Sequence, residues 1–459
     1  MLEKKKIRWN NKLRASLGLS AILLAVSLTG CGEISQQGQE ARPSVDAMVS
    51  ENEAVDAGSA TSDAEEQQNY SAPEILTGYE EPVVLENAPR IEQDNMAAKE
   101  QAQNQAQQSN PEPLLDQTSA TLLMAQQAGK YCYEQLSAQE QLLYVEILSI
   151  LQNHGEDSMV STNSPDALQR VFQCVYNDHP EIFWIDGYSY TRHMQGDEVS
   201  YLTFRGNYIY TEQECRDFRE GIDLYMYTFL SGIDSGASDY EKVKYAYDYL
   251  ILHTDYRLDA RDNQNILSVF LYGESVCQGY AKAMQYMLEQ LNVPCTIVVG
   301  TVFTGEGHAW NLVQIDGQYY YVDATWGDAS YIVDGAPTVD ARVPVNYEFL
   351  NVTTQELLKT HTIHHVVALP ECNAVEANYF YMENRYLTGY DEALLEQIFR
   401  EAYENGEIAV TLKCSDAQVY QAVCEELINR QAIFRFLQGD LSSVIYSLSD
   451  EECTLCFWL

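Results

Sequence analysis

The sequence places one cysteine, Cys277, where its thiol could act as a nucleophile. It lies in the run Gly-Glu-Ser-Val-Cys-Gln-Gly-Tyr-Ala, ahead of an apolar stretch that predicts a buried helix as far as Leu291. Ser275 is of a residue type that caps helices, so we expect Cys277 in the first turn. The free amides and dipole at a helix N-terminus favour a thiolate and could stabilise an oxyanion. Taken alone, Cys277 could equally be a buried structural cysteine.

A histidine and an aspartate follow on two segments that predict antiparallel strands. Residues 308–315 and 318–325 are rich in β-branched and aromatic types, and Asp316-Gly317 between them is a signal for a two-residue hairpin turn. In that register His308 and Asp323 are diagonal neighbours on one face of the sheet, close enough for an imidazole to meet a carboxylate. A shift of one residue would put them on opposite faces.

Together these three residues have the composition of a cysteine-based acyl-transfer site. His308 would serve as general base, oriented by Asp323, and Cys277 would be the nucleophile. Each has a plainer alternative, since His308 could be a structural histidine and Asp323 an ion-pair partner at a strand edge. The combination and its register favour the triad.

The motifs around these residues resemble the bacterial transglutaminase-like superfamily. They read Ser-Val-Cys277-Gln-Gly-Tyr-Ala, Gly-His308-Ala-Trp-Asn and Tyr-Val-Asp323-Ala-Thr-Trp, in the family's order. The similarity extends over about 238–370 and includes Glu-Leu-Leu-Lys-Thr-His361. It implies an α+β, papain-like fold, in which a nucleophile helix packs on an antiparallel sheet. It also implies Cys277 as nucleophile, His308 as base and Asp323 as the orienting residue.

The resemblance leaves the reaction open, because the family includes peptidases, amide cross-linkers and inactive relatives. An aromatic or amide side chain often adds an oxyanion donor, and Tyr256 and Gln278 are candidates. We expect an enzyme that acts on amide bonds of proteins or peptides, such as cell-wall peptides, without a cofactor. A non-catalytic binding or wall-scaffold protein that keeps the fold is the alternative.

Two other patterns, a metal site and a glycosidase carboxylate pair, are only weakly indicated. His361, His364, His365 and Cys372 lack the spacing of a zinc site, so we predict no metal. Asp323 and Asp328 could be imagined as a glycosidase carboxylate pair, but nothing else in the sequence favours that chemistry.

The N-terminus predicts export and lipid anchoring. A lysine- and arginine-rich start precedes an apolar run of about a dozen residues, too short for a membrane span of about 20 and typical of a signal peptide. The run ends in Leu-Thr-Gly-Cys31, which resembles the bacterial lipobox. We therefore expect residues 1–31 to hold a lipoprotein signal, with Cys31 diacylated and the protein anchored outside the cytoplasm. An ordinary signal peptide is the alternative.

The segment 32–115 predicts a disordered acidic tether, because its Gln-, Glu-, Ala- and Ser-rich composition cannot bury enough apolar surface. The formal net charge of the whole chain is -41, which disfavours nucleic acid as a partner.

The remaining chain predicts three folded domains. Residues 116–235 carry helix-cap signals at Ser137, Ser164 and Thr211 and a hairpin signal at Gly206-Asn207, so we expect a mainly helical domain there. Ser238 is a further cap at the start of the next helix. Residues 236–370 are the catalytic domain, and 371–459 alternate strand and helix as a small α/β domain of unassigned role. The 11 cysteines show no disulfide framework: without Cys31 and Cys277 an odd number remains.

Overall fold

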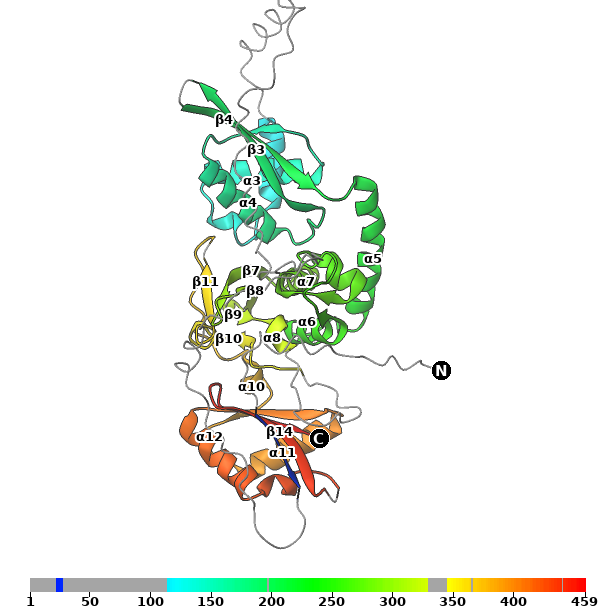
Figure 1. Cartoon of the computed structure of the whole chain (residues 1–459), viewed down its shortest axis with the longest axis vertical. Coiled ribbons are helices and arrows are strands. Elements are labelled where there is room, and N and C mark those ends of the chain that lie inside the picture. The colour runs from blue at the N-terminus through cyan, green and yellow to red at the C-terminus, as the bar shows by residue number, and fades with distance from the viewer. Residues whose placement is uncertain (1–21, 28–113, 196–197, 329–344, 365, 440) are drawn as a thin grey trace, which may run out of the picture.

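The computed structural model describes residues 22–27, 114–195, 198–328, 345–364, 366–439 and 441–459. Most of the predicted tether and the lipobox residue Cys31 lie outside these residues. The described residues form three groups of elements arranged along the long axis of the molecule (Figure 1). Within this described part, no helix combines the length and apolar character that crossing a bilayer requires.

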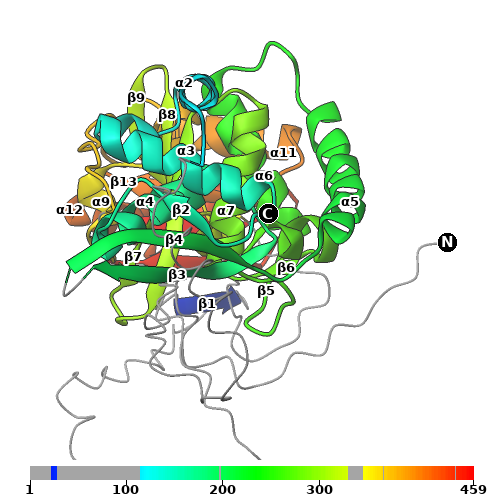
Figure 2. The ribbon, with the colours of Figure 1, turned by 90° about the horizontal axis from the view of Figure 1, so that it is seen from above.

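The first group corresponds to the predicted mainly helical domain and its hairpin. Its elements are α2 (Gln117–Gln126), η2 (Tyr133–Gln135), α3 (Ala138–Gln152), β2 (Ser158–Val160), α4 (Pro165–Asp178), β3 (Ile185–Gln195), β4 (Glu198–Tyr208) and α5 (Glu212–Ser231). The predicted caps Ser137, Ser164 and Thr211 each accept a backbone N–H through the side chain, so the helices begin where the sequence indicates. Seen from above, the β3–β4 hairpin and α5 lie on different sides of this group (Figure 2).

The predicted hairpin turn at Gly206-Asn207 is wrong. Gly206 lies inside β4 and pairs with Tyr188, and the two strands meet instead where Gln195 pairs with Glu198. The glycine has a packing role, because a Cβ at this position would lie 2.8 Å from the Leu151 side chain.

The second group holds the candidate site. Its elements are α6 (Asp239–His253), β5 (Asp255–Tyr256), η3 (Ser268–Tyr272), β6 (Glu274–Ser275), α7 (Cys277–Gln290), β7 (Cys295–Val302), β8 (Gly307–Ile315), β9 (Gln318–Val322), α8 (Ala324–Gly327), β10 (Leu350–Val352), α9 (Thr354–Leu357) and β11 (His361–His364). A five-stranded sheet has the order β10-β9-β8-β7-β11, with every neighbouring pair antiparallel. Asn311 on β8 donates from Nδ2 to the Ala281 carbonyl, which ties α7 to this sheet.

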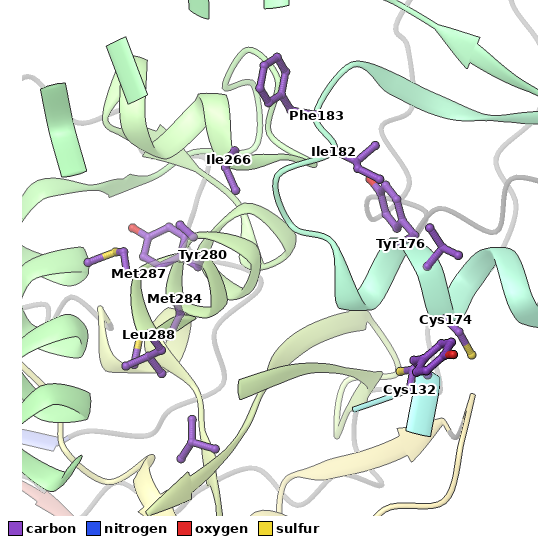
Figure 3. Packing of buried hydrophobic residues seen from close by; sticks show 14 of the residues in the cluster. Cys132, Cys174, Tyr176, Ile182, Phe183, Ile266, Tyr280, Met284, Met287 and Leu288 are labelled. Atoms are coloured by element: carbon purple, nitrogen blue, oxygen red, sulfur yellow. The ribbon is translucent and has the colours of Figure 1, made fainter. Parts of the chain in front are cut away.

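One hydrophobic core joins the first two groups. Tyr280, Met284 and Leu288 of α7 belong to the same buried cluster as Tyr176 and Ile182 of the first group (Figure 3). The domain boundary at residue 235 therefore stays a prediction, because apolar packing is continuous across it.

The third group is the C-terminal α/β part. Its elements are α10 (Tyr379–Met382), β12 (Tyr386–Leu387), α11 (Glu392–Glu404), β13 (Ala409–Cys414), α12 (Ala417–Cys424), η4 (Glu425–Asn429), η5 (Ala432–Arg435), β14 (Ser443–Ser449) and β15 (Thr454–Trp458). Its sheet, in the order β1-β14-β15-β13-β12, also includes β1 (Ile22–Ser27), which runs antiparallel to β14. Its residues from Leu387 onward have their own buried cluster, whereas Tyr379 and Phe380 of α10 belong to the core of the first two groups.

Ion pairs join the C-terminal part to the second group. Lys413 Nζ on β13 lies 3.4 Å from Glu356 Oε1 on α9, and Lys359 Nζ lies 3.1 Å from Glu452 Oε2. Lys413 and Glu452 are both buried. These ion pairs therefore tie α9 and the residues between α9 and β11 to the C-terminal part.

Candidate active site

The hairpin that carries the predicted base and its orienting carboxylate has the predicted register. Asp316 and Gly317 have φ values of 49° and 79°, the left-handed pair that a two-residue type I′ turn requires. Ile315 pairs with Gln318, and the ladder continues without a bulge along β8 and β9. The prediction of register from this dipeptide is confirmed.

The second strand ends earlier than predicted, at Val322 rather than at Thr325. Asp323 is the N-cap of the short helix α8, and its Oδ1 accepts the backbone N–H groups of Thr325 at 2.9 Å and Trp326 at 3.2 Å. This capping turns the chain into a helix directly after the strand. It also fixes one carboxylate oxygen and leaves Oδ2 for other partners.

His308 and Asp323 meet as predicted. His308 Nε2 lies 2.7 Å from Asp323 Oδ2, and both side chains are buried. Since Nε2 is engaged by the carboxylate, Nδ1 is the ring nitrogen left to serve the thiol. Cys277 lies close enough to His308 to contribute to the raised pKa of the imidazole.

The charges of this pair support each other. Burial opposes a charged imidazole, but the charge and hydrogen bond of Asp323, with a further contribution from Cys277, raise the pKa of His308 to about 10. Burial also opposes a charged Asp323, yet the bonds and charges of His308 and His361 hold the pKa of that carboxyl well below its usual range. At neutral pH the pair is therefore an imidazolium and a carboxylate.

Cys277 is the first residue of α7, as the sequence indicates, but the predicted cap is wrong. The N-cap is Val276, and no side chain caps the helix. Ser275 Oγ instead lies 2.6 Å from Ser268 Oγ, at the start of η3, and forms a hydrogen bond with it. The amides of the first turn thus have no side-chain acceptor, which leaves them available to an anionic group.

The site is nearly closed. Cys277 is 4% exposed and His308 6% exposed. Both residues are therefore almost completely shielded from solvent.

The two predicted oxyanion donors flank the nucleophile in different ways. Tyr256 pairs with Ser275 through the β5–β6 ladder, and burial, followed by the charges of Cys277, Glu306 and Asp323, raises its pKa, so its hydroxyl remains a proton donor. Gln278 is buried beside Cys277 in sequence, and its Oε1 has no hydrogen-bond partner among the described residues. The geometry leaves both as candidates.

A residue that the sequence did not assign to this site joins it. His361 Nε2 lies 3.2 Å from the same Asp323 Oδ2 that bonds His308, and His361 Nδ1 lies 2.8 Å from Thr360 Oγ1. His361 reaches the site because β11 pairs with β7, where it faces Val302. The motif that ends in His361 was its only signal.

The described residues bring one possible metal-ligand set together, and its geometry favours hydrogen bonding. Ligand atoms of His308, Asp323 and His361 lie within 4.8 Å of one another. However, the 2.7 Å separation of His308 Nε2 and Asp323 Oδ2 would give an angle of only about 80° at a zinc ion with ordinary bond lengths. His364 and Cys372 are not part of this set.

Comparison with known proteins agrees with this arrangement. The family sequence model of the transglutaminase-like superfamily matches residues 228–324, a range that contains Cys277, His308 and Asp323. Kyphoscoliosis peptidase of Mus musculus is 30% identical over 106 residues, which are 20% of this chain and 16% of that protein. The Homo sapiens protein is 29% identical over 134 residues, 24% of this chain and 20% of its own length. The chain thus spans a fifth or less of these curated relatives.

Solved structures with a similar part include a TGase, at 14% identity and a TM-score of 0.24, with 34% of this chain and 49% of that chain covered. Menin, whose structure concerns its binding site for the Mixed Lineage Leukemia protein, has 18% identity and a TM-score of 0.21, with 43% of each chain covered. The sequence motifs, the α+β fold and the match of the superfamily lead to one assignment: residues 228–324 of this chain form a transglutaminase-like domain.

Proposed function

We propose that this chain is a cysteine acyltransferase or cysteine peptidase that acts on amide bonds of proteins or peptides. Cys277 is the nucleophile, His308 transfers the proton and Asp323 orients the imidazole. The observation that carries the proposal is the buried 2.7 Å bond between His308 Nε2 and Asp323 Oδ2, with Cys277 near enough to the same imidazole to affect its pKa.

The first half of the reaction forms a thioester. His308 holds the proton that leaves Cys277, and the resulting thiolate attacks the carbonyl carbon of the amide. The carbonyl oxygen becomes an oxyanion, for which the uncapped amides of α7, the Tyr256 hydroxyl and the Gln278 amide are the candidate donors. When the carbon–nitrogen bond breaks, the His308 imidazolium gives its proton to the departing amine, and the acyl group remains on Cys277 Sγ.

The second half releases the acyl group. A water molecule or an amine loses a proton to His308 as it attacks the thioester, and the thiolate leaves and is restored. Water gives a carboxylate, so the protein would act as a peptidase or amidase. An amine gives a new amide, so the protein would act as a cross-linker. In both cases no cofactor takes part.

A non-catalytic scaffold is the second candidate, and the low exposure of Cys277 is the observation that favours it. Against it stands the cost of burying three polar side chains in one cluster, which a purely structural core would avoid. Two imidazoles and a carboxylate with matched hydrogen bonds are better explained by chemistry that uses them.

We also propose that the protein works outside the cytoplasm, anchored by a diacylated Cys31. The support is the basic start, the apolar run and the Leu-Thr-Gly-Cys motif. Processing ahead of Cys31 would remove β1 and leave β14 at the edge of the C-terminal sheet.

The test compares wild type with Cys277→Ala on a mixture of cell-surface and wall peptides, with and without a dansylated primary amine in water labelled with oxygen-18. We expect peptides that change only with wild type. Incorporated oxygen-18 identifies hydrolysis, and incorporated amine identifies cross-linking. Equal results for the two proteins would overturn the assignment of Cys277.

A further inference from the structure

A second imidazole lies in contact with Asp323, and the mechanism above gives it no task. The His361 side chain is fully buried, and His308 and His361 share one oxygen of the carboxylate. Aromatic rings surround His361: the ring centroids of Trp326, Trp310 and Phe349 lie 4.7, 4.9 and 5.7 Å from its own. A phenylalanine would fill such a space at lower desolvation cost, so the presence of an imidazole needs a reason.

The hydrogen bond of His361 to Asp323 fixes a proton on one of its ring nitrogens. A carboxylate can only accept, so the bond to Asp323 Oδ2 requires a proton on His361 Nε2. Nδ1 lies 2.8 Å from the Thr360 hydroxyl, which holds the other side of the ring. The bonds of His361 and of His308 therefore converge on the same oxygen of Asp323, one from each side.

All acceptor positions of Asp323 are occupied in this arrangement. Oδ1 takes two backbone N–H groups, and Oδ2 takes the two imidazoles. A carboxylate held by four donors cannot rotate without breaking several bonds. Its direction toward His308 is therefore fixed from both sides.

We propose that His361 is a positioning residue of this site: by donating to Asp323 Oδ2, it holds the carboxylate ionised and aligned on His308. This inference rests on the proposed acyl-transfer function and deepens it. The segment that carries His361 is itself secured, because Leu357 is fully buried and Glu356 and Lys359 pair with Lys413 and Glu452 of the C-terminal part.

The removal of His361 has a defined effect on titration. The titratable groups that act on Asp323 are His308 from β8 and His361 from β11, and the charge of Asp323 in turn helps to raise the pKa of Tyr256 on β5. His361 helps to lower the pKa of Asp323, so its loss moves that pKa upward. Activity that needs the ionised carboxylate should then be lost at a higher pH on the acid side.

The test measures the pH profile of kcat/KM for wild type, His361→Phe and His361→Gln, with thermal melting as a check of folding. The substrate is a peptide that wild type modifies, and Cys277→Ala is assayed on it in parallel. We expect His361→Phe to lose roughly 10- to 100-fold in kcat/KM and to shift its acid limb to higher pH. His361→Gln can still donate from Nε2, so it should recover most of the rate and of the wild-type profile.

Two further variants keep the outcome decisive. Thr360→Val removes the hydroxyl that contacts His361 Nδ1 and should give a smaller loss in the same direction, so it provides the test if His361→Phe fails to fold. His364→Gln, on the exposed end of the same strand, is the matched control and should behave as wild type. If Cys277→Ala is inactive while His361→Phe retains rate and profile, the positioning role is wrong and the acyl-transfer assignment stands. If Cys277→Ala is fully active, the acyl-transfer assignment itself fails.

Discussion

The imidazole of His308 and the carboxylate of Asp323 meet at 2.7 Å because a two-residue turn sets the register between β8, which carries His308, and β9, which Asp323 directly follows. The contact depends on local chain geometry more than on long-range packing. Asp323 adds a second constraint by capping α8, which fixes the oxygen that His308 does not use. The turn, the end of β9 and the start of α8 together direct the Asp323 carboxylate toward Nε2 of His308.

Cys277 should be the first thiol to react with iodoacetamide at pH 7. Cys424 and Cys453 are more exposed, but burial raises the pKa of Cys424 to about 11 and also raises that of Cys453. Thiols of that kind hold little thiolate at neutral pH, whereas the His308 imidazolium beside Cys277 can pair with its thiolate. Peptide mapping after short exposure measures the order of labelling.

The matched control for that experiment is His308→Ala, which should slow the labelling of Cys277 and leave Cys424 and Cys453 unchanged. Faster labelling of the exposed thiols in wild type would mean that the site is closed to a small reagent. That outcome would favour the non-catalytic scaffold.

Asp323→Asn should preserve the fold and lower the rate by roughly four orders of magnitude, because an amide favours the wrong tautomer of His308. Kinetics with a peptide that wild type modifies provide the measurement. A loss of less than tenfold would show that Asp323 does not orient the base.

The same variant should also change how stability depends on pH. Asp323 has a lowered pKa, so its contribution to stability is present above its ordinary pKa and is lost as pH falls. His308 has a pKa raised to about 10, so its contribution is fully present below its ordinary pKa of about 6.5 and is lost as pH rises through 10. The melting temperature of wild type should therefore fall between pH 7 and 10 more steeply than that of Asp323→Asn. Parallel curves would contradict the raised pKa.

Local signals carried most of what the sequence could predict. Asp316-Gly317 set the register of β8 and β9, and the serine and threonine caps gave the starts of four helices to within one residue. These features depend on a few neighbouring residues, so one chain suffices to recognise them. The α+β fold and the triad positions followed from them together with the motifs.

Features that depend on distant contacts escaped prediction. His361 reaches Asp323 only because β11 pairs with β7, and the chain between those strands holds the whole β8–β9 hairpin. Ser275 has the chemistry of a cap, but its hydroxyl is taken by Ser268 from a preceding element. In both cases tertiary packing brings the hydrogen-bond partner into place, and the residues next to His361 or Ser275 in the sequence do not indicate it.

Lipid anchoring predicts a specific mature N-terminus. We expect the protein to begin at Cys31, to carry diacylglycerol there and to partition with membranes. Cys31→Ser should prevent the modification and release the protein from the membrane fraction. Intact-mass analysis and fractionation check this, and an unmodified N-terminus elsewhere in the wild-type protein would contradict it.

Lys282→Met should stabilise the protein at neutral pH. Lys282 is fully buried on α7, its Nζ lies 3.1 Å from the centroid of the Tyr176 ring, and no hydrogen-bond acceptor is present for it among the described residues. Burial lowers the pKa of Lys282 well below its ordinary value. The unfolded chain therefore binds a proton more readily than the folded chain does, and Lys282 costs stability over that range.

The gain from Lys282→Met should be on the order of 1–3 kcal/mol at pH 7. It should shrink as pH rises toward the ordinary lysine pKa of about 10.4, because the unfolded chain then loses its proton as well. Denaturant unfolding at pH 7 and at pH 10 measures both quantities. Lys242→Met is the control, since Lys242 is only partly buried and pairs with Asp239 at 2.9 Å, and we expect it to change stability by less than about 1 kcal/mol. A loss of stability in Lys282→Met at pH 7 would mean that the contact of the amine with Tyr176 outweighs its burial, and that the folded protein keeps Lys282 charged.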